Sequence, residues 1–100
     1  MGLEEAQEFF KTYVDNVDNP EKAFLWLCEE IGELGRIIRT QKKNRYKDGI
    51  GDVLMWMFSL AQMLDVRVSQ ALEYSTQQLV AKGYTKLAAT GKIDRPLDLE

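Results

Sequence analysis

The sequence predicts an all-α protein, a four- to five-helix bundle formed as a single helical domain over residues 1–100. Apolar residues recur at intervals of three and four along most of the chain, which is the period of an amphipathic helix. No alternating run is strong enough to indicate a strand. With 45% hydrophobic residues in 100, the chain has material for one core. We expect that core within residues 3–88 and a C-terminal arm over residues 91–100.

Two helices are expected in the first 40 residues. The first has the apolar stripe Leu3, Ala6, Phe9, Phe10, Tyr13, Val14 and Val17. It should stop before Asn19, which can cap free amides, and Pro20, which suits a first helical turn. The second helix should end near Thr40, with the stripe Phe24, Leu27, Cys28, Ile31, Leu34 and Ile38. Cys28 is expected to be a small buried hydrophobe of that stripe.

The third expected helix, over residues 46–64, is apolar nearly all round. Its core face is expected to be Ile50, Val53, Leu54, Met57, Leu60, Ala61 and Leu64. Its other sides carry Met55, Trp56, Phe58 and Met63. Such a helix is buried on more than one side, and a monomer of four helices offers little to cover it. We therefore expect a homo-oligomer, most simply a dimer with two-fold symmetry.

A fourth helix is expected after the connection through Asp65. Its stripe is Val68, Ala71, Leu72 and Leu79. Gly83 and Gly91 are expected stops, and the arm after Gly91, which contains Pro96, should be ordered only if it packs on something. Four helices with one apolar face each and short connections bury those faces as a bundle.

The composition narrows the possible functions. Thirteen basic against sixteen acidic residues argue against nucleic-acid binding, which favours a basic surface. The longest uncharged apolar run, residues 53–64, is too short to span a membrane. One cysteine and no start resembling a secretory signal favour a cytoplasmic protein. With no histidine, any chemistry must depend on carboxylates.

Two lines of acidic residues border the apolar stripes. On the second helix, Glu30 and Glu33 share a line with Trp26, and on the third, Asp48 and Asp52 share a line with Trp56. Such charges repel one another, and a carboxylate withdrawn from water needs a partner. The candidates are Arg36 and Arg39, a protonated carboxyl pair, or a divalent cation. Oxygen ligands alone favour Mg²⁺, with Mn²⁺ as a relative. In an antiparallel helix pair, Asp52 is expected to reach the two glutamates only through an offset in the packing.

The stretches "WLCEEIGELGRII" and "DGIGDVLMWMFSLAQMLDVRVSQAL" resemble the MazG-like all-α NTP pyrophosphatases, whose pattern is E-E-x-x-E on one helix and E-x-x-D on the next. The resemblance covers about residues 20–73. It implies the fold of that family, homodimers or tetramers, and Mg²⁺-dependent cleavage of a nucleoside triphosphate to the monophosphate and pyrophosphate.

The same resemblance implies roles for single residues. Glu30, Glu33 and Asp52 would be metal ligands, and Glu29 a further ligand or the residue that orients the attacking water. The family's second-helix glutamate is replaced by Gly49, and Asp48, one residue earlier, is a possible substitute.

Substrate contacts are less defined by the sequence. Where family members commonly place lysine and asparagine on the last helix, Lys82 is the only cation. The phosphates could instead meet Arg36 or the other cations of residues 36–47, if this stretch is more than a solvated helix end. Trp26 and Trp56 could stack on a base, or simply pack.

Two functions remain open. The first is an NTP pyrophosphohydrolase with a reduced ligand set. The second is a catalytically degenerate relative that acts as a nucleotide-binding, metal-binding or interaction module. A purely structural bundle, the third possibility, predicts that glutamine at Glu30 or Glu33 stabilises the fold with no response to divalent ions.

Overall fold

The computed structural model describes residues 1–13, 19–83, 85–86 and 93–94. Its elements are α1 (Leu3–Tyr13), α2 (Pro20–Arg39), the 3₁₀ turn η1 (Lys43–Arg45), α3 (Tyr46–Met63), α4 (Val68–Ala81), β1 (Thr85–Lys86) and β2 (Ile93–Asp94). The all-α class is confirmed, with one small strand pair that the sequence had not indicated. The chain forms two compact units, Met1–Val68 and Ser69–Glu100. The single domain with a core over residues 3–88 stays a prediction.

The start of α2 follows the predicted capping. Asn19 is the N-cap in an extended conformation, and its side-chain oxygen accepts a hydrogen bond from the Lys22 amide at 2.7 Å. Pro20 occupies the first helical turn, where a missing amide hydrogen leaves nothing unsatisfied. Residues 14–18, which include the predicted stripe residues Val14 and Val17, lie outside the described part.

The ends of α2 and α3 use left-handed residues that are not glycine. Gln41 after α2 has φ 57° and Asp65 after α3 has φ 59°. In each case the next amide reaches back to the last turn: Lys42 N–H to the Ile37 carbonyl at 3.1 Å, and Val66 N–H to the Ala61 carbonyl at 2.9 Å. These bonds satisfy helix-end carbonyls, so both helices stop sharply without the glycine that usually marks such a stop.

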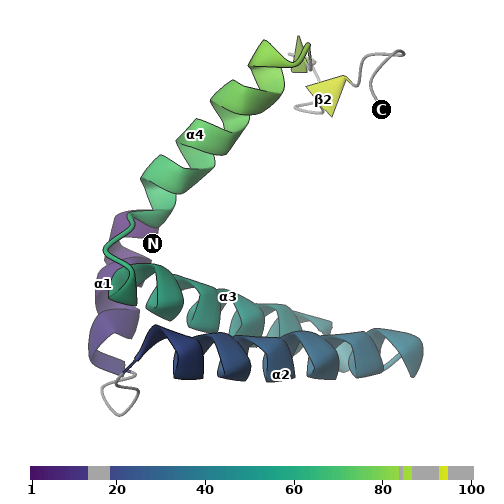
Figure 1. The fold of residues 1–100 in the computed structure, drawn as a ribbon. Helices are drawn as coiled ribbons and strands as arrows, with labels where there is room; N and C mark the ends of the chain where they lie inside the picture. Colours follow the sequence, from purple (N-terminus) through teal and green to yellow (C-terminus); the bar gives the residue numbers. More distant parts are fainter. Residues whose placement is uncertain (14–18, 84, 87–92, 95–100) are drawn as a thin grey trace. The chain divides into compact units, whose positions relative to one another are not determined.

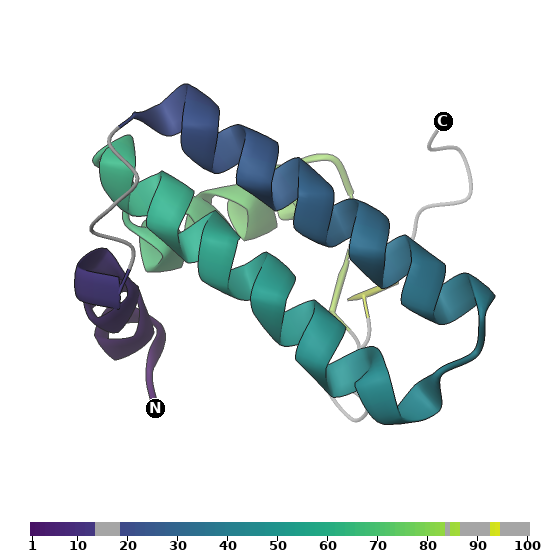
Figure 2. The ribbon, with the colours of Figure 1, turned by 90° about the horizontal axis from the view of Figure 1, so that it is seen from below.

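Helices α2 and α3 form an antiparallel hairpin, and they lie side by side along their length (Figure 2). The buried side of α2 is formed by Ala23, Leu27 and Ile37. The buried side of α3 is formed by Gly49, Phe58 and Ser59.

The face predicted to be the core of α3 is therefore only partly correct: Val53, Leu60 and Ala61 are half-buried, and the other four residues are exposed. About half of the side-chain surface is exposed at Ile50, Leu54 and Leu64. Phe24, Cys28, Ile31 and Ile38 of the α2 stripe are also exposed, so Cys28 is not the buried hydrophobe expected. The period was right, but the buried side is shifted: Leu27 of the predicted stripe is buried, and Ala23, Gly49 and Ser59, which lie outside the predicted faces, are buried with it.

Helix α1 lies crosswise at the end of the hairpin where α2 begins and α3 ends (Figure 1). Phe10 meets Phe58 of α3 edge to face, with ring centroids 6.2 Å apart. Beside it, the side chain of Gln7 is buried, with 1% exposed. Its Nε2 donates to the Val66 carbonyl at 2.7 Å, and its Oε1 accepts from the Val68 amide at 2.9 Å. One amide side chain thus ties α1 to the connection after α3.

We expect Gln7→Leu to lower the free energy of unfolding by about 2 kcal/mol, because each part-buried backbone group left without a partner costs about 1–3 kcal/mol and a solvating water offsets part of it. Urea unfolding followed by circular dichroism measures it. Glu8→Gln, on the exposed side of the same helix, is the matched control. Equal stability of Gln7→Leu and the control would contradict the role of Gln7 in tying α1 to the connection after α3.

The second unit contains most of α4 and the strand pair. The left-handed Gly83 (φ 99°) follows α4, as expected for a helix stop. Thr85 then pairs with Asp94 and Lys86 with Ile93 in antiparallel register. Gly91 and Pro96 lie outside the described residues. In the part of the chain that is described, no single helix is both long and apolar enough to cross a membrane. The segments Lys43–Met63 and Val68–Ala81 pass the test of length and composition only when they are taken together, and the chain is bent at the break between them.

Candidate active site

The register of the α2–α3 hairpin places the two acidic lines face to face. Trp26 of α2 stacks on Trp56 of α3, with ring centroids 5.6 Å apart and planes 10° from parallel. Farther along, Gly49 packs against Leu34 and Ile37. Between these two contacts, α2 carries its glutamates and α3 carries Asp52. No packing offset is needed, because the connection after α2 is short and the two helices run back along each other from it.

Glu30 is at the centre of the acidic residues. It is partly buried, and this loss of solvation raises the pKa of its carboxyl. The charges that raise this pKa further are, in decreasing order, those of Asp52, Glu29, Glu33 and Asp48. Four acids from two helices therefore act on one carboxylate, and the largest of these contributions comes from the opposite helix. The four other acidic residues that the sequence singled out thus lie within electrostatic range of Glu30.

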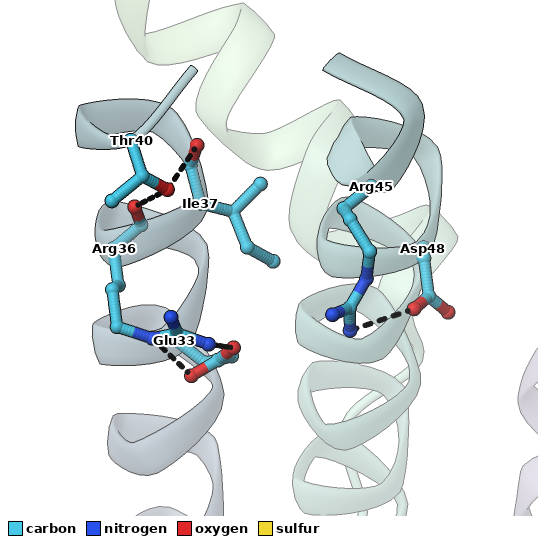
Figure 3. A network of polar contacts seen from close by, with 6 residues as sticks. All are labelled: Glu33, Arg36, Ile37, Thr40, Arg45 and Asp48. Atoms are coloured by element: carbon cyan, nitrogen blue, oxygen red, sulfur yellow. Dashed lines mark hydrogen bonds and ion pairs between the residues drawn. The ribbon is translucent and has the colours of Figure 1, made fainter. Parts of the chain in front are cut away.

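Two of these acids are already paired with arginine (Figure 3). Arg36 donates to both carboxylate oxygens of Glu33, from Nε to Oε2 at 3.1 Å and from Nη2 to Oε1. This hydrogen bond is the main cause that lowers the pKa of Glu33. On the neighbouring helix, Arg45 Nη2 lies 3.3 Å from Asp48 Oδ2. Both pairs are solvent-exposed and join residues three apart, so each contributes little to stability.

The chemistry and charge of these acids suit a divalent cation, but their positions do not form a complete set of ligands. Carboxylate oxygens suit Mg²⁺ or Mn²⁺. Nevertheless, within the described ranges no three Asp, Glu or Cys side chains are placed to hold one ion together. In addition, Arg36 engages both carboxylate oxygens of Glu33.

Gly49 stands where the resemblance expects a glutamate, and its surroundings explain how the hairpin uses it. A Cβ built there would lie 3.0 Å from Leu34 Cδ1 and 3.2 Å from Ile37 Cδ1. The position is buried in the contact between the helices rather than open to the acids. Asp48, the possible substitute, is exposed and turned to Arg45.

The other predicted site residues are placed as follows. The two tryptophans contact each other, and Trp26 remains 45% exposed beside the glutamates. Lys82 follows α4 in the second unit, whereas the acids belong to the first. An open hollow of about 450 Å³ near the α1 end contains none of the acids and is lined by Pro20, Glu21, Phe24, Leu25, Leu60 and Leu64.

Sequence reasoning missed the pairing of Arg45 with Asp48. Arg45 was grouped with the other cations of the basic stretch. The spacing of three residues between Arg45 and Asp48, at the start of a helix, is the pattern from which the pair could have been found.

The two central glutamates should respond oppositely to glutamine substitution in the absence of divalent ions. The raised pKa of Glu30 means that its charge opposes folding above that pKa, and that this penalty disappears as the pH falls below the ordinary glutamate range. The lowered pKa of Glu33 means the reverse: its charge favours folding above the ordinary glutamate pKa, and this stability is lost as the pH falls through the folded-state pKa.

At neutral pH with a chelator, we therefore expect Glu30→Gln to raise Tm and Glu33→Gln to lower it slightly. Both differences should shrink as the pH falls to about 4, where glutamate protonates. Thermal unfolding across this range measures them. A rise in Tm for both variants would mean that repulsion, not the Arg36 pair, governs Glu33.

Comparison with families of known proteins identifies the chain. The family model of the MazG nucleotide pyrophosphohydrolase domain matches residues 18–86, which is more than half of the chain and includes every acid of the cluster. Neither the search of curated proteins nor that of solved structures gave a match. The match and the helical structure agree with the resemblance drawn from the two acidic motifs, and the chain belongs to the MazG nucleotide pyrophosphohydrolase domain family.

Proposed function

We propose that this protein is a divalent-cation-dependent nucleoside triphosphate pyrophosphohydrolase, which hydrolyses an NTP or dNTP with water to the monophosphate and pyrophosphate. The observation that carries the proposal is the position of Glu30, a partly buried carboxylate surrounded by the charges of four other acids from α2 and α3. Repulsion of this kind is unfavourable without a cation. The family match supplies the reaction class.

In this proposal the chain's own residues have distinct tasks. Glu30, Glu33 and Asp52 hold the cation, which when bound would offset charge on the phosphate oxygens. Glu29, exposed next to Glu30, accepts a proton from the attacking water and orients it. The stacked tryptophans, one helical turn from Glu30 and Asp52, form a rigid apolar wall against which a base can lie.

The second candidate is a degenerate relative that binds nucleotide or metal without turnover. It is favoured by Gly49, since the hairpin fills the position of the family glutamate with Leu34 and Ile37. It is also favoured by the pairing of Asp48 with Arg45, which leaves the nearest substitute engaged.

Pyrophosphate release from a panel of common and damaged NTPs and dNTPs, with Mg²⁺ or Mn²⁺, separates the two candidates. The enzyme hypothesis expects turnover that stops with a chelator. Absence of turnover on every substrate, together with a rise in Tm on adding Mg²⁺ and a triphosphate, would establish the binding module instead.

We also propose that the protein is a homo-oligomer, most simply a dimer. The support is the set of exposed apolar residues on the hairpin: Phe24, Ile31 and Ile38 on α2, and Ile50, Leu54, Met57 and Leu64 on α3. Phe24 lines one hollow together with Leu60 and Leu64, so these parts of the two helices face the same side. Exposed apolar surface on this scale is typical of an interface.

Sedimentation of wild type and Leu54→Lys tests the oligomer. We expect the lysine to shift the assembly toward monomer, with Gly51→Lys, at an exposed position with open space, as the matched control. A monomeric wild type, or an unchanged assembly in Leu54→Lys, would contradict the proposal.

A further inference from the structure

The acids of the site differ in what neutralises them. Glu33 is held by Arg36 through two hydrogen bonds, and Asp48 by Arg45 through one contact of 3.3 Å. Glu30 and Asp52 form no ion pair with any described residue, and every charge that perturbs Glu30 is acidic. Among the described acids of the site, Glu33 is therefore the one whose two carboxylate oxygens are both bound by a guanidinium, that of Arg36.

This bidentate pair competes with a metal ion for Glu33. A guanidinium matches a carboxylate with two parallel hydrogen bonds, which take one lone pair of each oxygen, and its positive charge disfavours a cation on the same carboxylate. While Arg36 stays there, Glu33 is a weaker ligand for a cation shared with Glu30 and Asp52, and no three acids among the described side chains are placed to hold one ion. Arg36 is 45% exposed and Glu33 38% exposed, so the arginine can swing away without repacking the core.

We infer that Arg36 changes partner during binding: it holds Glu33 in the absence of a divalent cation, gives up this carboxylate when the cation binds, and then contacts the phosphates of the triphosphate. The inference rests on the proposed function and deepens it. Arg36 competes with the ion yet assists the nucleotide, so removing it should have opposite effects on the two ligands.

The position of Arg36 suits both partners. It lies three residues after Glu33, nearly one helical turn, so a released side chain remains beside the acids. Its guanidinium is fully charged at neutral pH and forms the same two-pronged contact with phosphate as with carboxylate. Arg39, on the same helix, makes no ion pair with a described residue and provides a control with the same loss of charge.

The test is a titration of the full chain with Mn²⁺ alone, in which free Mn²⁺ is counted by electron paramagnetic resonance. Quenching of the chain's two tryptophans reports binding near Trp26 and Trp56. We expect Arg36→Met to bind Mn²⁺ about two- to fivefold more tightly than wild type, since an exposed ion pair that competes with the cation is removed. Arg39→Met should change the affinity by less than about twofold, because a distant exposed charge is screened.

A double variant ties the effect to Glu33. If Arg36 acts by covering this carboxylate, Arg36→Met adds no affinity in a Glu33→Gln background. A second titration uses a non-hydrolysable triphosphate analogue in saturating Mn²⁺, where Arg36→Met should bind the analogue about tenfold more weakly, as expected for one lost charged contact. Arg36→Lys, which keeps the charge but not the two-pronged geometry, should lie between wild type and Arg36→Met in both titrations.

Three results would overturn the inference. They are equal Mn²⁺ affinity in Arg36→Met and Arg39→Met, tightening that persists without Glu33, and unchanged or tighter binding of the analogue in Arg36→Met. These results leave the proposed enzyme intact as long as wild type binds Mn²⁺ at the acids. Absence of Mn²⁺ binding in every variant would instead remove the cation site itself, and the inference with it. Arg36 is exposed, and thermal unfolding of each variant checks that the fold is unchanged.

Discussion

Glu30→Gln is expected to lower kcat/KM for pyrophosphate release about 10²–10⁴-fold, because a cation that stabilises developing phosphate charge is worth several kcal/mol and each 1.36 kcal/mol is tenfold in rate. Glu30 is the partly buried acid whose pKa is raised by the charges of the other four. Glutamine keeps the size of the side chain but supplies one neutral oxygen in place of a carboxylate.

The measurement is initial-rate pyrophosphate release at several Mg²⁺ concentrations. Glu8→Gln on α1, whose ion pair with Lys11 is exposed and 3.9 Å long, is the control for the same chemical change outside the cluster. We expect the fold of the Glu30→Gln variant to be intact, since the substitution removes repulsion and should raise Tm in the absence of divalent ions. Activity within about threefold of wild type, a loss of less than 1 kcal/mol in transition-state stabilisation, would show that Glu30 is not in the reacting site.

Gly49→Glu is expected to lower the free energy of unfolding by about 1–3 kcal/mol, since overpacking and the burial of a carboxylate outweigh the gain of about 1 kcal/mol in helix propensity. Even the Cβ of a side chain at position 49 would lie 3.0 Å from Leu34 Cδ1, and the contact between the helices around it is apolar. Restoring the family glutamate is therefore not expected to restore or improve activity in this hairpin without changes at Leu34 and Ile37.

The measurement is urea unfolding, which compares the stability of Gly49→Glu with that of the control Gly51→Glu. Position 51 is exposed and has nothing within 4 Å of a built Cβ, so glutamate there should be neutral or stabilise by up to about 1 kcal/mol through helix propensity. A Gly49→Glu protein as stable as Gly51→Glu would contradict the packing described at the hairpin. Higher turnover in that protein would instead identify the missing glutamate as the only defect of the site.

The helix boundaries could be predicted because they depend on local chemistry. Asn19 and Pro20 start α2 through interactions within one turn, and the sequence placed them correctly. The end near Thr40 and the start at Tyr46 were also predicted. The left-handed Gln41 and Asp65 were not, because these conformations are maintained by hydrogen bonds to the preceding turn rather than by a preference of the residue.

The sequence could nominate the acids of the candidate site but not their pairing. Spacings of three and four put Glu30 and Glu33 on one line and Asp48 and Asp52 on another. Whether each acid then meets another acid, an arginine or solvent depends on helix register and on side-chain direction. The sequence offered Arg36 and Arg39 equally, and the structure pairs Glu33 with Arg36.

By itself, the sequence determined the helices and the family of the chain, and it nominated the acids of the site, because periodicity, caps and motif spacing are properties of residues close together in the chain. Only the tertiary structure decided which side of each helix is buried, that Gly49 is a packing position, and that Glu30 lies opposite Asp52. The physical reason is that α2 and α3 each carry apolar residues on more than one side, so periodicity permits several packings. Close approach of the backbones at small residues selects one of them, and with it the partners of every charged group.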